Sequence, residues 1–214
     1  MTESPHAHAH EHTAEPIRPE DMDWDAHYRG EAQLWSGHVN GSLADEVDGL
    51  SPGRALDVGC GEGADAIWLA EHGWSVTAID VAPTAVERGR TEAARRGLTI
   101  DWLAGDLLTD GPAGEFDLVS LHYPAFAGSR RDDVVAALTG RVAPGGLLLV
   151  VGHAFTDDPA ALEYDPTDWV QPPDVVAALP DGFTVELDEV RPRPGDHHAH
   201  SAHTEDVIVR IRRR

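Results

Sequence analysis

The chain has 214 residues, 41% of them hydrophobic and 6% aromatic, and its 38 acidic and 16 basic residues give a formal net charge of -22. This length suits one domain with a sizeable core. The charge repels phosphate backbones and anionic lipids, so we expect neither nucleic acid nor a membrane surface as partner. No apolar run approaches the roughly 20 residues of a membrane span. One cysteine, Cys60, cannot form an internal disulfide, which predicts a cytoplasmic protein.

The N-terminal segment divides into two parts. Residues 1–20 have histidine at every second position from 6 to 12 and no apolar periodicity, which predicts a disordered tail. Because histidines chelate transition metals, a non-catalytic metal-binding protein is one alternative function. In residues 21–50 large apolar side chains recur every three to four positions, which predicts a helical lead-in. Its aromatic residues, which either close as a lid over a ligand or pack on the domain, are Trp24, Tyr28 and Trp35.

From residue 54 onward short apolar runs alternate with helical patterns. This repetition predicts an α/β fold with a doubly wound, mostly parallel sheet and helices on both faces. The last two strands follow each other without a helix, so they are expected to form an antiparallel hairpin. The predicted strands are 55–58, 75–79, 98–103, 116–121, 146–151, 183–190 and 206–211, and the predicted helices are 64–72, 83–96, 132–141 and 174–179.

The most informative stretch, ALDVGCGEGADA at residues 55–66, is a strand that runs through a Gly-rich turn into a helix. Glycines let the backbone approach a ligand, and open parallel sheets hold ligands at the carboxyl ends of their strands. Gly59, Gly61 and Ala64 also fit a dinucleotide fingerprint, with Asp80 where a ribose-binding acid is expected. An NAD-dependent oxidoreductase is therefore a second alternative. Asp57 argues against it, because NAD folds usually have an apolar residue there.

Residues 57–63, DVGCGEG, resemble motif I of the class I S-adenosylmethionine-dependent methyltransferases. The resemblance covers about residues 50–212. It implies a Rossmann-like sheet of seven strands with an antiparallel last strand, and a methyltransferase domain at 51–214 that binds S-adenosylmethionine. The further segments that match, in the family's order, are VTAID at 76–80, AGDL at 104–107, FDLVS at 116–120 and LTGRVAPGGLLLVV at 138–151.

The resemblance also implies which residues hold the cofactor. Asp80 would accept hydrogen bonds from both ribose hydroxyls, and Asp106 one from the adenine amino group. Each acid has an alternative role as a helix cap or turn residue. The implied cofactor-binding set is Asp57, Gly59, Cys60, Gly61, Gly63, Asp80, Val81, Gly105, Asp106, Leu107 and Leu121.

Methyl transfer needs alignment, exclusion of water and, for a poor nucleophile, a base. His122 and Tyr123, at the end of the fourth predicted strand, are the candidate catalytic residues, with His122 as general base. Alternatively, both only wall the cofactor pocket. Histidine and arginine in the last hairpin loop suit an anionic or metalloid oxyanion, unless that loop is a solvated polar segment. The remaining substrate-side candidates are Phe126, His153, His198 and His200.

Together these patterns predict a small-molecule methyltransferase with no bound metal. The lead-in helix, the compact core and the aromatic pattern are most similar to the tellurite-resistance and thiopurine methyltransferase branch. That branch modifies soft sulfur, selenium or tellurium nucleophiles, so the resemblance implies an acceptor of this kind.

Overall fold

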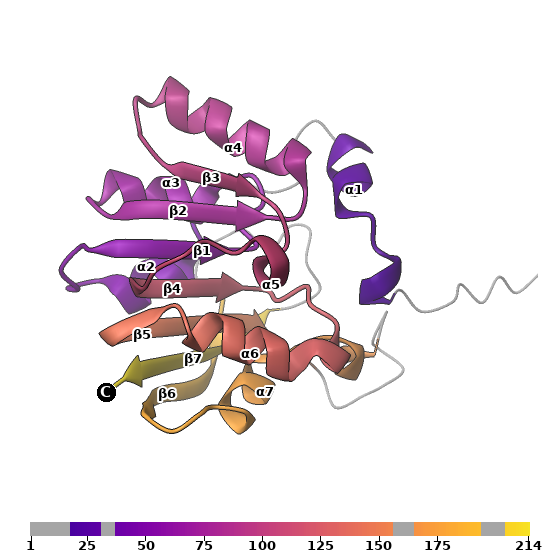
Figure 1. Ribbon diagram of the computed structural model, residues 1–214, viewed down its shortest axis with the longest axis vertical. Helices are drawn as coiled ribbons and strands as arrows, with labels where there is room; N and C mark the ends of the chain where they lie inside the picture. The colour runs from indigo at the N-terminus through magenta and orange to yellow at the C-terminus, as the bar shows by residue number, and fades with distance from the viewer. Residues whose placement is uncertain (1–17, 31–36, 156–164, 194–203) are drawn as a thin grey trace, which may run out of the picture.

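The computed structural model describes residues 18–30, 37–155, 165–193 and 204–214. One seven-stranded sheet, in the order β3-β2-β1-β4-β5-β7-β6, runs through the molecule (Figure 1). Within the described residues no helix is both long and apolar enough to cross a membrane. The strands are β1 (Arg54–Val58), β2 (Ser75–Asp80), β3 (Asp101–Ala104), β4 (Phe116–His122), β5 (Val142–His153), β6 (Phe183–Pro192) and β7 (Glu205–Arg213).

The helices connect these strands and flank the sheet. In the part of the chain that the structure describes, three short 3-10 helices add turns outside the core. The α-helices are α1 (Trp24–Gly30), α2 (Gly41–Val47), α3 (Ala64–Glu71), α4 (Pro83–Arg95), α5 (Leu107–Asp110), α6 (Arg131–Thr139) and α7 (Pro172–Ala177), and the 3-10 helices are η1 (Pro19–Asp21), η2 (Gly128–Arg130) and η4 (Pro166–Asp168).

The predicted fold class is confirmed. Strands β1 to β5 pair in parallel, whereas β7 is antiparallel to both β5 and β6. In the register of the centre, Val58 pairs with Ile79 of β2 and with Leu121 of β4. The carboxyl ends of these three strands therefore meet at one edge of the sheet, where parallel sheets place ligands.

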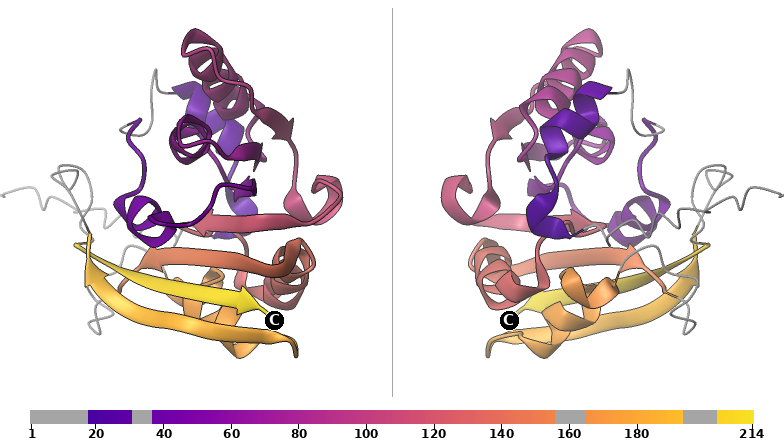
Figure 2. Two further views of the ribbon diagram at one scale, coloured as in Figure 1. Left: turned by 90° about the vertical axis from the view of Figure 1, so that its left-hand side faces the viewer. Right: turned by 90° about the vertical axis from the view of Figure 1, so that its right-hand side faces the viewer.

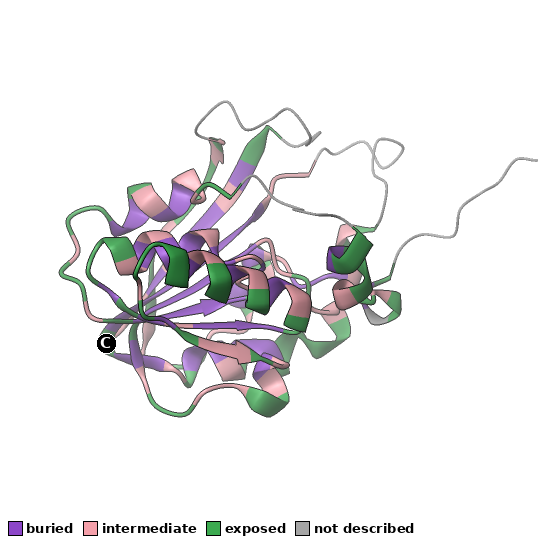
Figure 3. Cartoon of the chain, turned by 90° about the horizontal axis from the view of Figure 1, so that it is seen from above, coloured by how far each residue is buried: buried purple, intermediate pink, exposed green. Residues whose placement is uncertain are grey.

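Apolar side chains fill both faces of the sheet. One cluster joins alternate residues of the central strands to α6 and α7, and the other joins the remaining strand residues to α2, α3 and α4. In β5, for example, Leu148 and Val150 belong to the first cluster and Leu149 and Val151 to the second. The central strands are accordingly buried along most of their length (Figure 3). Burial on both faces explains the continuous apolar runs in the sequence.

Two strands begin three or more residues away from their predicted starts. β5 begins at Val142 rather than 146, and its register against β4 shifts between Phe116 and Leu118. Pro144 and Gly145, with a φ of 76°, interrupt the apolar pattern at this irregularity, which is why the sequence does not reveal the strand's start. β3 begins at Asp101 rather than 98, because Leu98 and Ile100 pack against the core before pairing begins.

The lead-in forms two helices that pack on the domain in different ways. α1 lies beside α4 (Figure 2), where the carboxylate of Asp25 accepts a hydrogen bond from Thr84 N–H at 2.8 Å. Tyr28 is buried against Ala82 and Ala85 at the start of α4, and Trp24 packs partly buried on the same cluster. Trp35, the third aromatic residue of the predicted pattern, lies outside the described residues.

An ion cluster around the buried carboxylate of Glu46 holds α2 against the end of the sheet formed by β7 and β6. The side chain of Glu46 is only 5% exposed, and its two oxygens lie 2.6 Å from Arg191 Nη1 and 2.8 Å from Arg210 Nη1. These arginines belong to β6 and β7, so the carboxylate of Glu46 joins α2 to the C-terminal hairpin. A carboxylate this buried is stable only because its partners compensate for the lost hydration.

We expect Glu46→Gln to lower the free energy of unfolding by about 1 to 3 kcal/mol, because it removes charge-assisted hydrogen bonds from a buried group. Glu186→Gln is the matched control, since Glu186 also pairs with Arg210 and with Arg212 but is 30% exposed. Its loss should stay below about 1 kcal/mol. Urea denaturation measures both changes, and equal losses in the two variants would contradict a special role for Glu46.

Candidate active site

The Gly-rich turn lies at the carboxyl edge of the sheet, between β1 and α3. Gly63, with a φ of 82°, directly precedes α3, and a Cβ atom there would overlap the Trp102 ring. Gly59, with a φ of 65°, has no heavy atom within 4 Å of the position of an added Cβ. The protein thus packs tightly against the turn at Gly63 and leaves open space beside Gly59. Such space allows a ligand to approach the backbone closely.

Asp80 ties the end of β2 to this turn. Its Oδ2 accepts a hydrogen bond from Gly61 N–H at 2.8 Å and its Oδ1 one from Ala82 N–H at 2.8 Å. Burial raises the pKa of Asp80, and these two N–H groups oppose the rise. Each oxygen retains a further acceptor site for a ligand hydroxyl. The next residue, Val81, is 46% exposed, which makes it an apolar surface beside the carboxylate.

Asp57, which precedes the Gly-rich turn, is 2% exposed. Ser120 Oγ donates to its Oδ1 at a long 3.4 Å, and its Oδ2 has no hydrogen-bond partner among the described residues. Burial, followed by the charges of Asp65 and Asp80, raises the pKa of Asp57 well above the ordinary value. An orphaned buried acceptor beside an open turn fits a ligand that brings positive charge or hydrogen-bond donors.

The other predicted cofactor residues have structural contacts as well. Asp106 caps α5 by accepting from Leu108 N–H at 2.9 Å, and its Oδ2 lies 3.2 Å from Arg130 Nη1. The cap alternative is thus what the structure shows, and contact with adenine stays a prediction. Leu107 and Leu121 are buried core residues. The backbone N–H of Gly105 donates a hydrogen bond to the Asp80 carbonyl at 2.9 Å. Burial raises the pKa of the Cys60 thiol, and the charges of Asp57 and Asp80 raise it further.

His122, the last residue of β4, is 8% exposed, and neither ring nitrogen has a hydrogen-bond partner among the described residues. Its Nδ1 lies 3.6 Å from Oδ2 of Asp65, in the first turn of α3. Burial lowers the pKa of His122, and the charges of Asp65 and Asp206 oppose this effect. The imidazole is therefore held neutral by its surroundings, in the form that can accept a proton.

Tyr123 is the only non-glycine residue with positive φ, 51°, in the described part of the chain. Its hydroxyl donates to Asp206 Oδ2 at 3.1 Å and accepts from Arg193 Nη2 at 2.9 Å. Its ring stacks on His153 with centroids 4.4 Å apart. Burial and the charge of Asp206 raise the pKa of Tyr123. Residues from the ends of β4, β5, β6 and the start of β7 thus meet in one cluster.

Sequence reasoning found part of this cluster. His122, Tyr123 and His153 come together as predicted, whereas Phe126 packs against the apolar core. The sequence analysis missed Asp65 and Asp206. It assigned arginine of the hairpin loop to an anionic substrate, whereas Arg193 pairs with Asp206 at 3.5 Å. A signal for Asp206 existed, because it opens the last strand of the hairpin and pairs in register with His153. The hairpin-loop candidates His198 and His200 lie outside the described residues.

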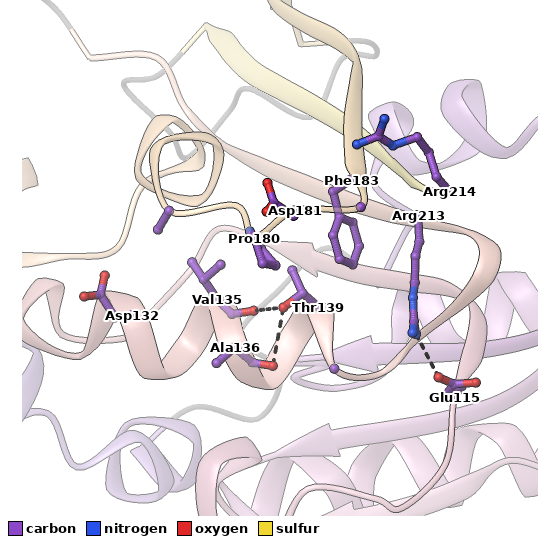
Figure 4. Close-up of a pocket in the computed structure, with 13 residues that line it drawn as sticks. Glu115, Asp132, Val135, Ala136, Thr139, Pro180, Asp181, Phe183, Arg213 and Arg214 are labelled. Carbon is purple, nitrogen blue, oxygen red and sulfur yellow. Dashed lines mark hydrogen bonds and ion pairs between the residues drawn. The ribbon is translucent and has the colours of Figure 1, made fainter.

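A separate hollow of about 610 Å³ lies at the opposite edge of the sheet, between the C-terminal turn of α6 and the turn before β6 (Figure 4). Arg213, which lines it, pairs with Glu115 at 2.7 Å, and Thr139 donates to the Val135 carbonyl of its own helix. The side chains of Arg213 and Thr139 are thus engaged by the protein. The hollow also lies at the amino ends of the parallel strands, away from the Gly-rich turn.

A family model described as "Methyltransferase domain" matches residues 55–146. Ribosomal RNA small subunit methyltransferase C of Alcanivorax borkumensis is 34% identical over 107 residues, which cover 48% of this chain and 33% of the relative. The 2-heptyl-1-hydroxyquinolin-4(1H)-one methyltransferase of Mycobacteroides abscessus is 42% identical over 89 residues, which cover 37% of this chain and 39% of the relative. The chain therefore spans well under half the length of these curated relatives.

Two solved structures are similar over most of the chain. One, from work on the conversion of a disulfide bond into a thioacetal group during echinomycin biosynthesis, has a TM-score of 0.71 and 26% identity, and the match covers 88% of this chain and 89% of that one. The other is N-methyltransferase NodS from Bradyrhizobium japonicum in complex with S-adenosyl-L-homocysteine. Its TM-score is 0.65 at 20% identity, with coverage of 88% and 95%. The likeness thus extends far beyond the Gly-rich turn.

We expect Gly59→Ala to weaken binding of S-adenosylhomocysteine by about tenfold or more, because the new methyl group occupies the open space above the turn. Gly97→Ala is the control, since Gly97 also has a positive φ, 73°, and open space, but lies at the end of α4. Both variants should lose about 1 to 2 kcal/mol of stability from left-handed backbone strain. Calorimetric titration and urea denaturation separate the two effects; an equal loss of affinity in both variants would contradict the placement.

The raised pKa of Asp57 predicts a pH effect on stability. The folded protein holds this proton more tightly than the unfolded chain, so the wild type loses stability as pH rises from the ordinary carboxyl pKa to the raised one. Asp57→Asn has no such loss, and its stability relative to wild type should rise as the pH increases above the ordinary carboxyl pKa. Urea denaturation across this range tests the sign, with exposed Asp101→Asn as control; a constant difference would show that Asp57 ionises normally.

Proposed function

We propose that this chain, in which residues 55–146 are a methyltransferase domain, transfers a methyl group from S-adenosylmethionine to a small-molecule acceptor. The observation that carries the proposal is the edge where Gly59 is open above its backbone, Asp80 retains acceptor capacity and Asp57 Oδ2 has no hydrogen-bond partner within the described residues. These features suit a ligand with a hydroxyl-bearing sugar and a positively charged group. NodS, of the same fold, binds S-adenosyl-L-homocysteine.

The turn and the ends of β2 and β3 would hold the cofactor. Asp80 would accept from the ribose hydroxyls, Val81 would pack against the adenine and Asp106 would accept from its amino group. When bound, S-adenosylmethionine supplies an electrophilic methyl group whose bonding electron pair stays on the sulfur. The protein itself has to align the acceptor, exclude water and remove a proton.

His122 and Tyr123 would act on the acceptor side of this reaction. His122 is buried, neutral and without hydrogen bonds to the described residues, so its free nitrogen can accept a proton. Tyr123 fixes the wall of the site through Asp206 and Arg193. Trp24 and Tyr28 of α1, beside the start of α4, would cover the cofactor from the lead-in side.

We further propose that the acceptor is a soft nucleophile such as a thiol, and that the enzyme acts in the cytoplasm. The similar structure from echinomycin work concerns sulfur chemistry, which supports this class, and the net charge of -22 opposes RNA. The relative named for ribosomal RNA shares only a third of its length with this chain. The single cysteine needs no oxidising compartment.

Calorimetric titration of the full chain with S-adenosylhomocysteine, and separately with NADH, tests the cofactor. We expect one-to-one binding of S-adenosylhomocysteine alone. Asp80→Asn should weaken it by about 10- to 100-fold, because a charge-assisted hydrogen bond contributes about 1.5 to 3 kcal/mol. Asp101→Asn, an exposed acid at the start of β3, is the control and should bind like wild type. Uptake of NADH without S-adenosylhomocysteine would replace the proposal with the oxidoreductase alternative.

A further inference from the structure

Asp65 was not among the residues that the sequence singled out, yet it is the nearest ionisable partner of His122. It lies in the first turn of α3, 6% exposed, with Oδ2 3.6 Å from His122 Nδ1. Asp206 of β7 is the second acid that influences His122. Its Oδ2 accepts a hydrogen bond from Tyr123, and its Oδ1 lies 3.5 Å from Arg193 Nε. The charges of the two carboxylates therefore act on the imidazole from different elements and under different constraints.

The carboxylate of Asp65 is itself held in place. Asn40, the residue before α2, donates its backbone N–H to Oδ1 and its side-chain Nδ2 to Oδ2, both at 2.8 Å. Two hydrogen bonds from one residue fix the plane of the carboxylate. The order Asn40, Asp65, His122 thus connects the lead-in segment to the end of β4.

We propose that Asp65 is a positioning residue, which keeps the proton of His122 on Nδ1 and so leaves Nε2 free to take a proton from an acceptor that arrives uncharged. A carboxylate facing Nδ1 stabilises the tautomer with hydrogen on that nitrogen, as in other aspartate–histidine pairs. This proposal rests on the methyl transfer proposed above. It adds the residue that selects the reactive nitrogen of the base.

The charges around His122 define the acceptor class. Asp65 and Asp206 are buried at this edge, and the guanidinium of Arg193 already pairs with Asp206 and lies over the Tyr123 ring. An oxyanion would meet mainly like charge here. A neutral nucleophile that is protonated near pH 7, such as an alkyl thiol, a phenol or an alcohol, avoids this repulsion.

The proton balance follows from the same groups. As the acceptor atom bonds to the transferred methyl carbon, its hydrogen leaves as a proton and is taken by His122 Nε2. The resulting imidazolium is stabilised by the charges of Asp65 and Asp206, and Tyr123 of the adjoining loop stays un-ionised. The proton then passes to water when the product leaves, which restores the neutral base.

The tautomer can be read without any substrate, from ¹⁵N NMR of the full chain with labelled histidine. The His122 signal is assigned by its loss in His122→Ala. We expect wild type to be protonated on Nδ1, and Asp65→Asn to give a mixture of tautomers and a lower imidazole pKa. Asp206→Asn is the matched control, because it removes the other acid whose charge acts on His122. It should lower the imidazole pKa of His122 and leave the tautomer unchanged.

Should Asp65→Asn fail to fold, Asn40→Ala keeps the charge but frees the carboxylate, and it should also increase the minor tautomer. An unchanged Nδ1 tautomer in Asp65→Asn, or in the folded Asn40→Ala, overturns the proposal. Parallel titration with S-adenosylhomocysteine keeps the cofactor question apart: wild type that does not bind it contradicts the proposed function whatever the NMR shows.

The acceptor class is tested with benzyl mercaptan and selenite as probes. We expect methylation of the thiol, with kcat lower by about 100-fold or more in His122→Ala, the usual contribution of a general base. In Asp65→Asn we expect a smaller loss, confined to kcat. Methylation of selenite, or of the thiol at the same rate in His122→Ala, would overturn the assignment of an uncharged acceptor and a histidine base.

Discussion

Burial of carboxylates at one edge of the sheet is the constraint on which the site depends. A buried carboxylate is unfavourable unless hydrogen bonds or opposite charges replace its hydration. Each acid here contacts a different segment at the edge, and among the described residues Asp57 has the weakest contacts. The four acids are Asp57, Asp65, Asp80 and Asp206.

The partners of these acids shape the surrounding backbone. Asp80 holds Gly61 and Ala82 by their N–H groups, which fixes the Gly-rich turn against the start of α4. Asp65 holds Asn40 and thereby the beginning of α2. Asp57 contacts Ser120 of β4, and Asp206 of the hairpin holds the hydroxyl of Tyr123. The conformation that a ligand meets is thus largely the one that satisfies these carboxylates.

The C-terminal hairpin takes part in this arrangement at both ends. Near the site, Asp206 and Arg193 hold the hydroxyl of Tyr123, whose φ of 51° is costly for a residue with a side chain. Farther along the same strands, Glu46 joins the hairpin to α2. The backbone strain of Tyr123 is therefore supported by contacts from strands distant in sequence, a pattern found where a side chain must be held in one orientation.

The sequence could predict what depends on local pattern. Alternating strands and helices predicted the sheet, and the glycines with Asp80 predicted the edge that holds the ligand. The pairing of Asn40 with Asp65 could not be predicted, because it joins a loop to a helix 25 residues away through side-chain geometry. Asp106 shows the opposite limit, since the same residue type at a strand end suits both a ligand contact and a helix cap.

Asp57 connects these observations to chemistry. Its carboxylate has the poorest set of partners of the four acids, and its neighbours in charge are Asp65 and Asp80. A protein could remove this unfavourable group with an amide or an apolar side chain of similar size. Its presence beside an open glycine turn is understandable if a bound group supplies the missing positive charge. A cation beside Asp57 would relieve the repulsion among Asp57, Asp65 and Asp80. His122 would stay neutral and able to accept a proton.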